Sequence, residues 1–292
     1  MTEQKWTSER LPSFEGRTVI VTGATSGLGR VVATQLGAKG ARVVLAVRNV
    51  AAGEEVAATI GGSAEVRALD LADLSSVRHF ADEWEGEIDV LINNAGIMMV
   101  PKRLTTDGYE SQFATNHLGH FALTNLLLPH ITDRVVTVAS SAHRWGGFDL
   151  DDLNWERRDY RTERAYGQSK ISNLLFTLEL QRRLEGTGRR AYAAHPGYAA
   201  TNLQSHTGNP VKHALMALGN RVVAQSAEAG ALPTLYAASQ DLPPGSYVGP
   251  DGLGEYRGSP TLVGRTAVAS DPELARKLWT ESESLTGVSW PL

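Results

Sequence analysis

Runs of consecutive apolar residues alternate along this chain with segments whose apolar residues recur every three or four positions. The first pattern is typical of strands buried on both faces of a sheet, and the second of helices that bury one side. A β-branched run at 18–22 is followed by a glycine-rich turn and by a helical pattern at 30–36. The same rhythm predicts further strands at 41–47, 64–70, 88–92, 134–139, 191–195 and 246–248. It predicts further helices at 51–60, 74–84, 109–128, 166–184 and 227–239, and a last helix from Pro272.

This alternation favours a parallel sheet, because a crossover helix returns the chain to the edge at which the previous strand began. We predict a single α/β domain over residues 1–292, built as a doubly wound parallel sheet with helices on both faces. The rhythm weakens at 198–223, which includes a short amphipathic piece at 211–218 and which we interpret as a substrate lid. Residues 251–292 form a C-terminal tail, and we expect the lid and the tail to line the substrate pocket.

Composition narrows the classes of function. The chain has 292 residues, 42% of them hydrophobic, and a formal net charge of −4 with scattered Lys and Arg, which argues against nucleic-acid binding. It has no cysteine, which excludes a disulfide framework and thiolate chemistry. Residues 1–10 carry no apolar leader, and no run reaches the ~20 apolar residues of a membrane span. We therefore expect a cytoplasmic protein with no membrane partner.

The turn after the first strand has the composition of a phosphate-binding loop. Its glycines permit a tight turn and a close backbone approach, and the first N–H groups of the next helix point at an anion. A mononucleotide loop would need Gly-Lys-Ser/Thr after its second glycine, and none follows here. A flexible surface loop is the alternative interpretation. We assign pyrophosphate binding to Gly23, Thr25, Ser26, Gly27, Leu28 and Gly29.

Residues that directly follow the later strands complete a dinucleotide site, because ligands of doubly wound sheets bind at the carboxyl ends of strands. Arg48 stands where an acid would bind a ribose 2′-hydroxyl, and its guanidinium can pair with a 2′-phosphate, which predicts NADP(H). An ordinary surface arginine is the alternative. Asp70 and Leu71 are placed to meet the adenine, or Asp70 caps the next helix. The fourth strand ends in a tight path beside a ribose, formed by Asn94, Ala95 and Gly96.

Tyr166 and Lys170 are four residues apart, so they share one face of a helix. A phenol is a weak base at neutral pH, and an adjacent ammonium favours its phenolate. Ser140 and Ser141 end the fifth apolar run and can hydrogen-bond a substrate oxygen. Asn116 lies in the middle of a predicted helix, where asparagine is a poor helix former. Taken singly, these residues read as a solvated pair, a strand cap and a surface asparagine.

Together the motifs resemble the short-chain dehydrogenase/reductase family, over residues 16 to 248. The resemblance implies a Rossmann-type fold and a catalytic tetrad of Asn116, Ser141, Tyr166 and Lys170. In that family Tyr166 is the general acid/base, and Ser141 joins it in binding the substrate oxygen. Lys170 binds the nicotinamide ribose and lowers the tyrosine pKa, and Asn116 supports a proton relay through water. The nicotinamide amide would meet Pro196, Gly197 and Thr201.

Within the family the chain resembles the retinol-dehydrogenase-like subgroup, because Ser141 is followed by Ala-His143 and Arg48 follows the second strand. The resemblance implies an oxidoreductase that transfers hydride between NADP(H) and a lipophilic carbonyl or alcohol. A non-catalytic NADP(H)-sensing protein of the same fold is the alternative. The insert at 148–161 can obstruct the helix faces through which relatives pair, so a monomer and a homodimer both stay open. We expect no metal site, because His143 and His195 lack a third ligand at suitable spacing.

Overall fold

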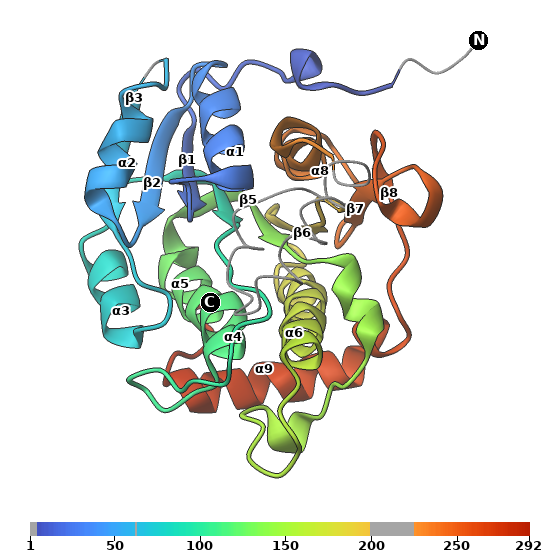
Figure 1. Ribbon diagram of the computed structural model, residues 1–292. Coiled ribbons are helices and arrows are strands. Elements are labelled where there is room, and N and C mark those ends of the chain that lie inside the picture. The colour runs from blue at the N-terminus through green and yellow to red at the C-terminus, as the bar shows by residue number, and fades with distance from the viewer. Residues whose placement is uncertain (1–4, 62, 199–224) are drawn as a thin grey trace, which may run out of the picture.

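A twisted eight-stranded sheet forms the centre of the molecule, with the strand order β3-β2-β1-β4-β5-β6-β7-β8 (Figure 1). The computed structural model describes residues 5–61, 63–198 and 225–292. The strands are β1 (Thr18–Thr22), β2 (Arg42–Val47), β3 (Ser63–Ala68), β4 (Ile88–Asn93), β5 (Ile131–Val138), β6 (Arg190–Ala194), β7 (Tyr247–Pro250) and β8 (Pro260–Leu262). Neighbours from β3 to β7 pair in parallel, which confirms the predicted sheet.

Strand β8 was not predicted, and it pairs with β7 in antiparallel fashion, with Val248 opposite Leu262. The chain reverses through a short loop, in which the amide of Asp251 donates to the carbonyl of Ser259 over 2.8 Å. A reversal of this kind needs no crossover helix. Three residues are also too short for an apolar pattern to indicate a strand.

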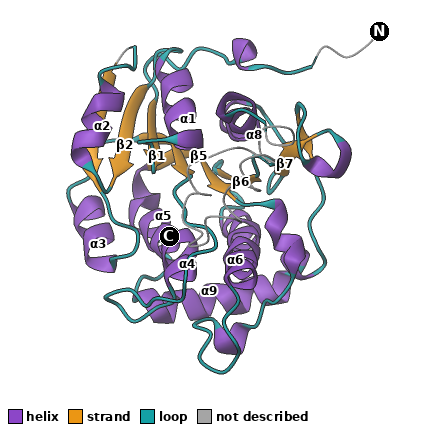
Figure 2. Cartoon of the chain, viewed as in Figure 1, coloured by secondary structure: helices purple, strands orange, loops and turns teal. Residues whose placement is uncertain are grey.

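Helices cover both faces of the sheet, as Figure 2 shows. They are α1 (Gly27–Gly37), α2 (Val50–Ala57), α3 (Leu74–Asp82), α4 (Ser111–Phe113), α5 (Gly119–Leu127), α6 (Thr162–Arg183), α8 (Ala227–Ser239) and α9 (Pro272–Thr286). Successive side chains of a strand point to opposite faces. Val19 therefore packs in one core with α1, α2 and α8, and Ile20 in the other with α3, α5 and α6.

The helix predicted at 109–128 is shorter and irregular. It begins at Ser111, because the carboxylate of Glu110 caps it by accepting from the amides of Gln112 and Phe113. A π-helical turn, Ala114–Leu118, separates α4 from α5 and contains Asn116. Single π turns inside helices are frequent at functional sites. Asn116, the poor helix former of the predicted helix, thus lies where the helix departs from α-helical geometry.

The C-terminal region is part of the core. Helix α9 lies across one end of α6 in Figure 1, and the ring of Trp279 stacks on Phe176 at 5.7 Å. Trp279 also meets Phe121 edge-on at 4.9 Å. Helix α9 therefore packs against α6, and the effect of the insert at 148–161 on pairing between copies stays a prediction. The predicted lid at 199–223 and the piece at 211–218 lie outside the described residues. Among the described residues no helix is both long and apolar enough to span a bilayer.

Candidate active site

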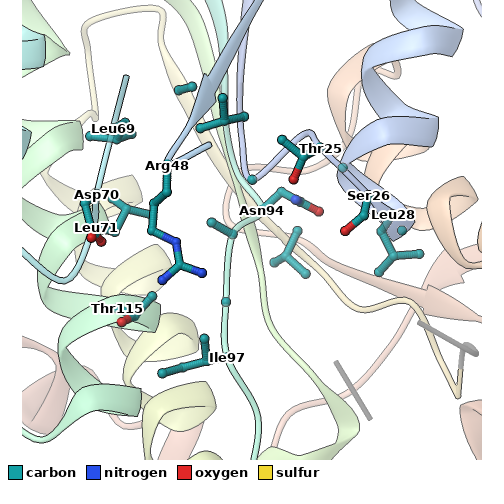
Figure 3. Close-up of a pocket in the computed structure, with 18 of the residues that line it drawn as sticks. Thr25, Ser26, Leu28, Arg48, Leu69, Asp70, Leu71, Asn94, Ile97 and Thr115 are labelled. Atoms are coloured by element: carbon teal, nitrogen blue, oxygen red, sulfur yellow. The ribbon is translucent and has the colours of Figure 1, made fainter. Parts of the chain in front are cut away.

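A cavity opens at the carboxyl ends of the central strands, between the β1–α1 turn and α6 (Figure 3). Most of the residues predicted from the sequence line it: Gly23, Thr25, Ser26, Gly27, Leu28, Gly29, Arg48, Asp70, Leu71, Asn94, Ala95, Gly96, Tyr166, Lys170 and Pro196. It is also lined by residues that the sequence had not singled out, namely Ala46, Val47, Asn49, Leu69, Ile97, Thr115, Val138 and Ala139. These belong to strand ends and helix faces, and no local motif marks them.

Two glycines of the β1–α1 turn are needed for steric reasons. Gly23 has a positive φ of 68°, and a Cβ there would lie 2.9 Å from the Cα of Ala95. A Cβ on Gly29 would lie 2.4 Å from Nδ2 of Asn94 and 2.5 Å from the carbonyl oxygen of Gly23. The turn and the segment after β4 therefore pack backbone against backbone, which leaves their amides at the cavity wall.

The N-terminus of α1 offers unpaired N–H groups to this cavity. Its N-cap residue, Ser26, makes no side-chain capping bond within the described chain, and the first turn contains no acid. By contrast, Asn49 caps α2 through Ala52, and Asp73 caps α3 through Ser75. Free helical N–H groups and the positive end of the helix dipole together favour an anion. This part of the cavity therefore suits a pyrophosphate.

Arg48 extends from the end of β2 into the cavity. Figure 3 shows its guanidinium directed towards Thr115, with Thr25 and Ser26 on the other side of Asn94. The side chain is exposed and has no hydrogen bond or ion pair among the described residues. An unpaired guanidinium at this place can receive a phosphate.

Asp70 lines the cavity, and it is not the cap of α3. Its Oδ1 accepts from the amide of Ala72 over 3.0 Å, whereas Asp73 accepts from Ser75 and Ser76 at the start of the helix. The capping alternative for Asp70 is thus wrong. The adenine-binding role stays a prediction, supported by its position.

Tyr166 and Lys170 lie on α6 and face the cavity. Tyr166 is 8% exposed, and Nζ of Lys170 lies 5.6 Å from the centre of its ring. Nζ also donates to the carbonyl of Val138 over 3.0 Å. An ammonium has three donors, so this bond anchors Lys170 to β5 and leaves others for a ligand.

The pKa of Tyr166 departs from the prediction. Burial raises it to about 12, although a hydrogen bond from Ser140 acts in the opposite direction. Burial also lowers the pKa of Lys170 to about 8. In this structure burial determines the direction of both shifts, because removal of both groups from water disfavours both charged forms, and the lowering of the tyrosine pKa by the lysine stays a prediction.

The two serines after β5 have different surroundings. Ser140 Oγ accepts from the amide of Ala142 over 3.1 Å and is hydrogen-bonded to Tyr166. Ser141 opens a 3₁₀ turn, Ser141–Trp145, and is half-buried. The sequence had assigned the substrate-binding role to Ser141. The structure gives the direct contact with Tyr166 to Ser140, and the role of Ser141 stays a prediction.

Asn116 holds the loop after β4 against α6. Its Oδ1 accepts from the amide of Ile97 over 2.8 Å, and its Nδ2 donates to the carbonyl of Ile97 over 2.9 Å. Nδ2 also donates to Oγ of Ser169 over 2.9 Å. A Cβ on Gly96 would lie 3.1 Å from Asn116 Oδ1 and 3.7 Å from Lys170 Nζ. The asparagine therefore joins the cavity wall to the helix that carries Tyr166 and Lys170.

The segment after β6 brings in residues that the sequence did not indicate. Pro196 lines the cavity and Gly197 follows it, while Thr201 lies outside the described residues. The ring of His195 is 3.0 Å from Oε2 of Glu255. The other oxygen of this carboxylate, Oε1, accepts from Arg144 over 2.7 Å. Because 60 residues separate His195 from Glu255, no sequence spacing could have revealed this contact.

None of the cavity-lining residues comes from 251–292 or from the insert at 148–161. The insert instead packs at the starts of α4 and α6, where the hydroxyl of Tyr160 donates to Glu110 over 3.0 Å. The part of the chain that the structure describes contains no cluster of three potential metal-binding side chains.

Comparisons with known proteins agree with this geometry. Residues 17–152 match the family model described as short chain dehydrogenase. Human retinol dehydrogenase 13 is 42% identical over 295 residues, which span 96% of this chain and 87% of that protein. A solved structure of an uncharacterised protein from Mycobacterium paratuberculosis is 54% identical, with a TM-score of 0.86, and the match covers 99% of this chain and 100% of that one.

A third match concerns the cofactor. It is a structure from Beutenbergia cavernae, described as a candidate NAD(P)-dependent gluconate 5-dehydrogenase with bound NADP. It is 28% identical, with a TM-score of 0.62, and the match covers 78% of this chain and 91% of that one. The identity to the human enzyme extends over nearly the whole chain. Together with the other matches and the geometry of the site, it establishes that the chain belongs to the short-chain dehydrogenase family, within its retinol-dehydrogenase-like group.

Proposed function

We propose that this short-chain dehydrogenase is an NADP(H)-dependent enzyme that interconverts a lipophilic carbonyl compound and its alcohol. The observation that carries the proposal is that a single cavity contains the glycine turn, Arg48 and the Tyr166–Lys170 pair. The residues present fit a dinucleotide phosphate, because a Cβ would fill the cradle at Gly29 and the N–H groups of α1 lack a side-chain cap within the described chain. When bound, NADP(H) supplies the hydride chemistry.

In this proposal, Arg48 selects the phosphorylated cofactor. Its guanidinium has no competing acidic partner among the described residues, so a 2′-phosphate gains a charge-assisted hydrogen bond there. An acid at the end of β2 would instead bind a free 2′-hydroxyl.

Tyr166 is the proton donor to the carbonyl oxygen. With a pKa of about 12 its phenol is protonated at neutral pH, which is the form that carbonyl reduction requires. Ser140 orients the phenol, and Ser141, one residue further, is the hydroxyl assigned to the substrate oxygen. Lys170, fixed by Val138, holds the ribose hydroxyls and keeps the cavity beside the phenol polar.

Asn116 acts on this site from behind the cavity wall. Both hydrogens of its amide are engaged, one by Ile97 and one by Ser169. Asn116 thus keeps the loop after β4 and α6 at a constant separation, and its part in a proton relay through water stays a prediction.

The substrate class follows from the residues on the side of Tyr166 that faces away from the glycine turn, which we call the open side. The ring of Trp145 lies 6.2 Å from the tyrosine ring, and Trp145 is 48% exposed. An exposed indole beside a catalytic phenol suits an apolar substrate. The name of the human relative, a retinol dehydrogenase, points to the same class. A cytoplasmic location and the choice between monomer and homodimer stay predictions from the sequence.

The test measures NADPH consumption with a panel of apolar aldehydes and ketones, and NADP⁺ reduction with the matching alcohols. Loss of a general acid removes about 10²- to 10⁴-fold of the rate, so Tyr166→Phe should lose turnover by that factor and still bind NADPH. The alternative, a non-catalytic NADP(H) sensor, predicts NADPH binding without turnover in the wild type. Turnover that survives in Tyr166→Phe would contradict the assignment of the proton donor.

A further inference from the structure

The imidazole of His120 lies between the two halves of the site without touching the cavity. His120 belongs to the first turn of α5 and is 1% exposed. Its Nδ1 is 3.0 Å from the carbonyl oxygen of Asn116, and its Nε2 is 2.9 Å from Oγ of Thr22. Thr22 ends β1, and Asn116 lies in the π-helical turn.

The hydrogen bonds determine which nitrogen carries the proton. A carbonyl oxygen only accepts, so Nδ1 must be protonated to face Asn116 at 3.0 Å. Oγ of Thr22 accepts from the amides of Asn94 and Ala95, each over 2.9 Å, which uses both of its lone pairs. The threonine hydroxyl therefore has only its own proton left for Nε2 of His120, and it donates over 2.9 Å to this nitrogen in preference to the carbonyl of Ile92 at 3.4 Å. These bonds define the Nδ1–H tautomer.

The ring is also neutral under ordinary conditions. Burial lowers the pKa of His120 to about 4, against the opposing effect of the Asn116 carbonyl, and the charge of Lys170 lowers it further. At pH 7 Nε2 is thus an acceptor, in agreement with the count of bonds at Thr22.

Each of the two groups held by His120 supports one wall of the site. Thr22 Oγ positions the backbone of Asn94 and Ala95, which line the cavity. Asn116 positions Ile97 and, through Ser169, the helix that carries the catalytic pair. Within the described structure, His120 is bonded to both.

We propose that His120 is a positioning residue. In its Nδ1–H tautomer it couples the segment after β4, which Thr22 holds, to helix α6, which Asn116 holds. The inference rests on the proposed function, since it concerns how the same site keeps its geometry. It goes beyond that function, because it assigns separate effects to the two ring nitrogens.

Two variants separate these effects. In His120→Asn the amide can replace Nδ1 and still donate to Asn116, but it does not reach Thr22. In His120→Gln the longer side chain can replace Nε2 at Thr22, but it leaves the Asn116 carbonyl without its donor. A single neutral hydrogen bond corresponds to about a fivefold effect.

We expect His120→Asn to raise the dissociation constant for NADPH about fivefold with little change in kcat, and His120→Gln to lower kcat about fivefold with little change in affinity. In a Thr22→Val background, His120→Asn should cost no further affinity, because the bond it removes is already absent. If both variants instead reduce affinity and kcat together, in proportion to lost stability, His120 only fills space and the proposal is overturned.

A measurement on the wild-type protein keeps the proposal testable if the variants fold poorly. Long-range ¹H–¹⁵N correlation spectra of the histidine side chains should show His120 as the Nδ1–H tautomer across pH 6 to 8, because this whole range lies at least about two units above the pKa. An Nε2–H tautomer or a charged ring would overturn the proposal. Absence of turnover in the wild type would refute the proposed function instead, and the tautomer measurement does not depend on it.

Discussion

The two sides of Tyr166 are held together in different ways. On the cofactor side, the glycine turn packs directly on the segment after β4, where the amide of Asn94 donates to the hydroxyl of Thr22 and the side chain of Asn94 donates to the Thr22 carbonyl. On the open side, charged side chains from distant parts of the chain meet: Arg144 and His195 both bind Glu255.

Both sides contain buried polar atoms without a hydrogen-bond partner among the described residues, and on the cofactor side Oδ1 of Asn93, at the end of β4, is one of them. On the open side, two buried polar atoms, Nε2 of His143 and the hydroxyl of Tyr247, have no hydrogen-bond partner among the described residues. Their rings are 5.7 Å apart. The cofactor side is a wall of backbone contacts, and its shape depends on glycines and short local motifs. The open side is a wall of side-chain pairs, and its shape can change with each substitution. Under the proposed function, the phosphate cradle is therefore built mainly from the path of the backbone, whereas the open side, where the substrate is proposed to bind, depends on side chains.

The largest expected effect lies on the open side, at the two serines. Ser141→Ala should lower kcat about a hundredfold or more, which is the usual cost of a lost donor to a developing oxyanion. Ser140→Ala should lower it less, by about tenfold, because it removes the hydrogen bond to Tyr166 and a neutral bond is weaker. Steady-state kinetics of both variants, with NADPH binding as a control, decide the roles. The reverse order would assign the substrate oxygen to Ser140.

On the cofactor side, Gly29→Ala should nearly abolish NADPH binding. Its Cβ would overlap Asn94 Nδ2 at 2.4 Å and the carbonyl of Gly23 at 2.5 Å, so the turn must open. Overpacking of this kind costs about 1–3 kcal/mol, up to a hundredfold in affinity. Gly61→Ala is the matched control, since no atom of the described chain lies within 4 Å of a Cβ there. Equal NADPH dissociation constants for the two variants would show that the turn is not rigid.

A smaller change tests whether side chains also act on the cofactor side. Arg48→Ala should weaken NADPH binding about 30-fold, the equivalent of one charge-assisted hydrogen bond of about 2 kcal/mol. NADH binding should change little, because that cofactor lacks the 2′-phosphate. Titrations of both cofactors measure the ratio. If Arg48→Ala weakened the binding of NADPH and NADH by the same factor, the proposed preference for NADP(H) would have no basis.

The smallest effect concerns the acid stability of the open side. Burial lowers the pKa of His195 to about 4, below the ordinary value of 6.5. The unfolded chain therefore takes up a proton first as pH falls below 6.5, and the folded protein loses stability until pH 4. Between pH 6.5 and 5.5 this amounts to about 1 kcal/mol, because the unfolded imidazole is already half-protonated at pH 6.5.

The measurement is the free energy of unfolding in denaturant at several pH values, for the wild type and His195→Gln. The stability advantage of the wild type should shrink by that amount over the interval. A constant difference between wild type and His195→Gln would mean that His195 titrates normally in the folded protein.

The sequence predicted most of the fold and of the cofactor side. Helix α8 was predicted with its observed bounds, Ala227–Ser239, and the parallel strands to within a few residues. The motifs at Gly23–Gly29, Asn94–Gly96 and Tyr166–Lys170 are short, and parallel strands bring their carboxyl ends to one edge. Local patterns were therefore sufficient to collect these residues in one cavity. Strand β8, the cap at Glu110 and the π turn were not predictable, because each depends on contacts that a residue pattern does not describe.

By itself, the sequence determined the order of strands and helices, the places where only glycine fits, and the spacing that puts Tyr166 and Lys170 on one helical face. These features depend on backbone geometry over a few residues, which the chain encodes locally. Only the tertiary structure decided the protonation of Tyr166, the contact of Ser140 with it, the pairing of His195 with Glu255 and the bridge made by His120. Burial and hydrogen bonding of this kind arise when distant segments exclude water together, and no local stretch of sequence contains that information.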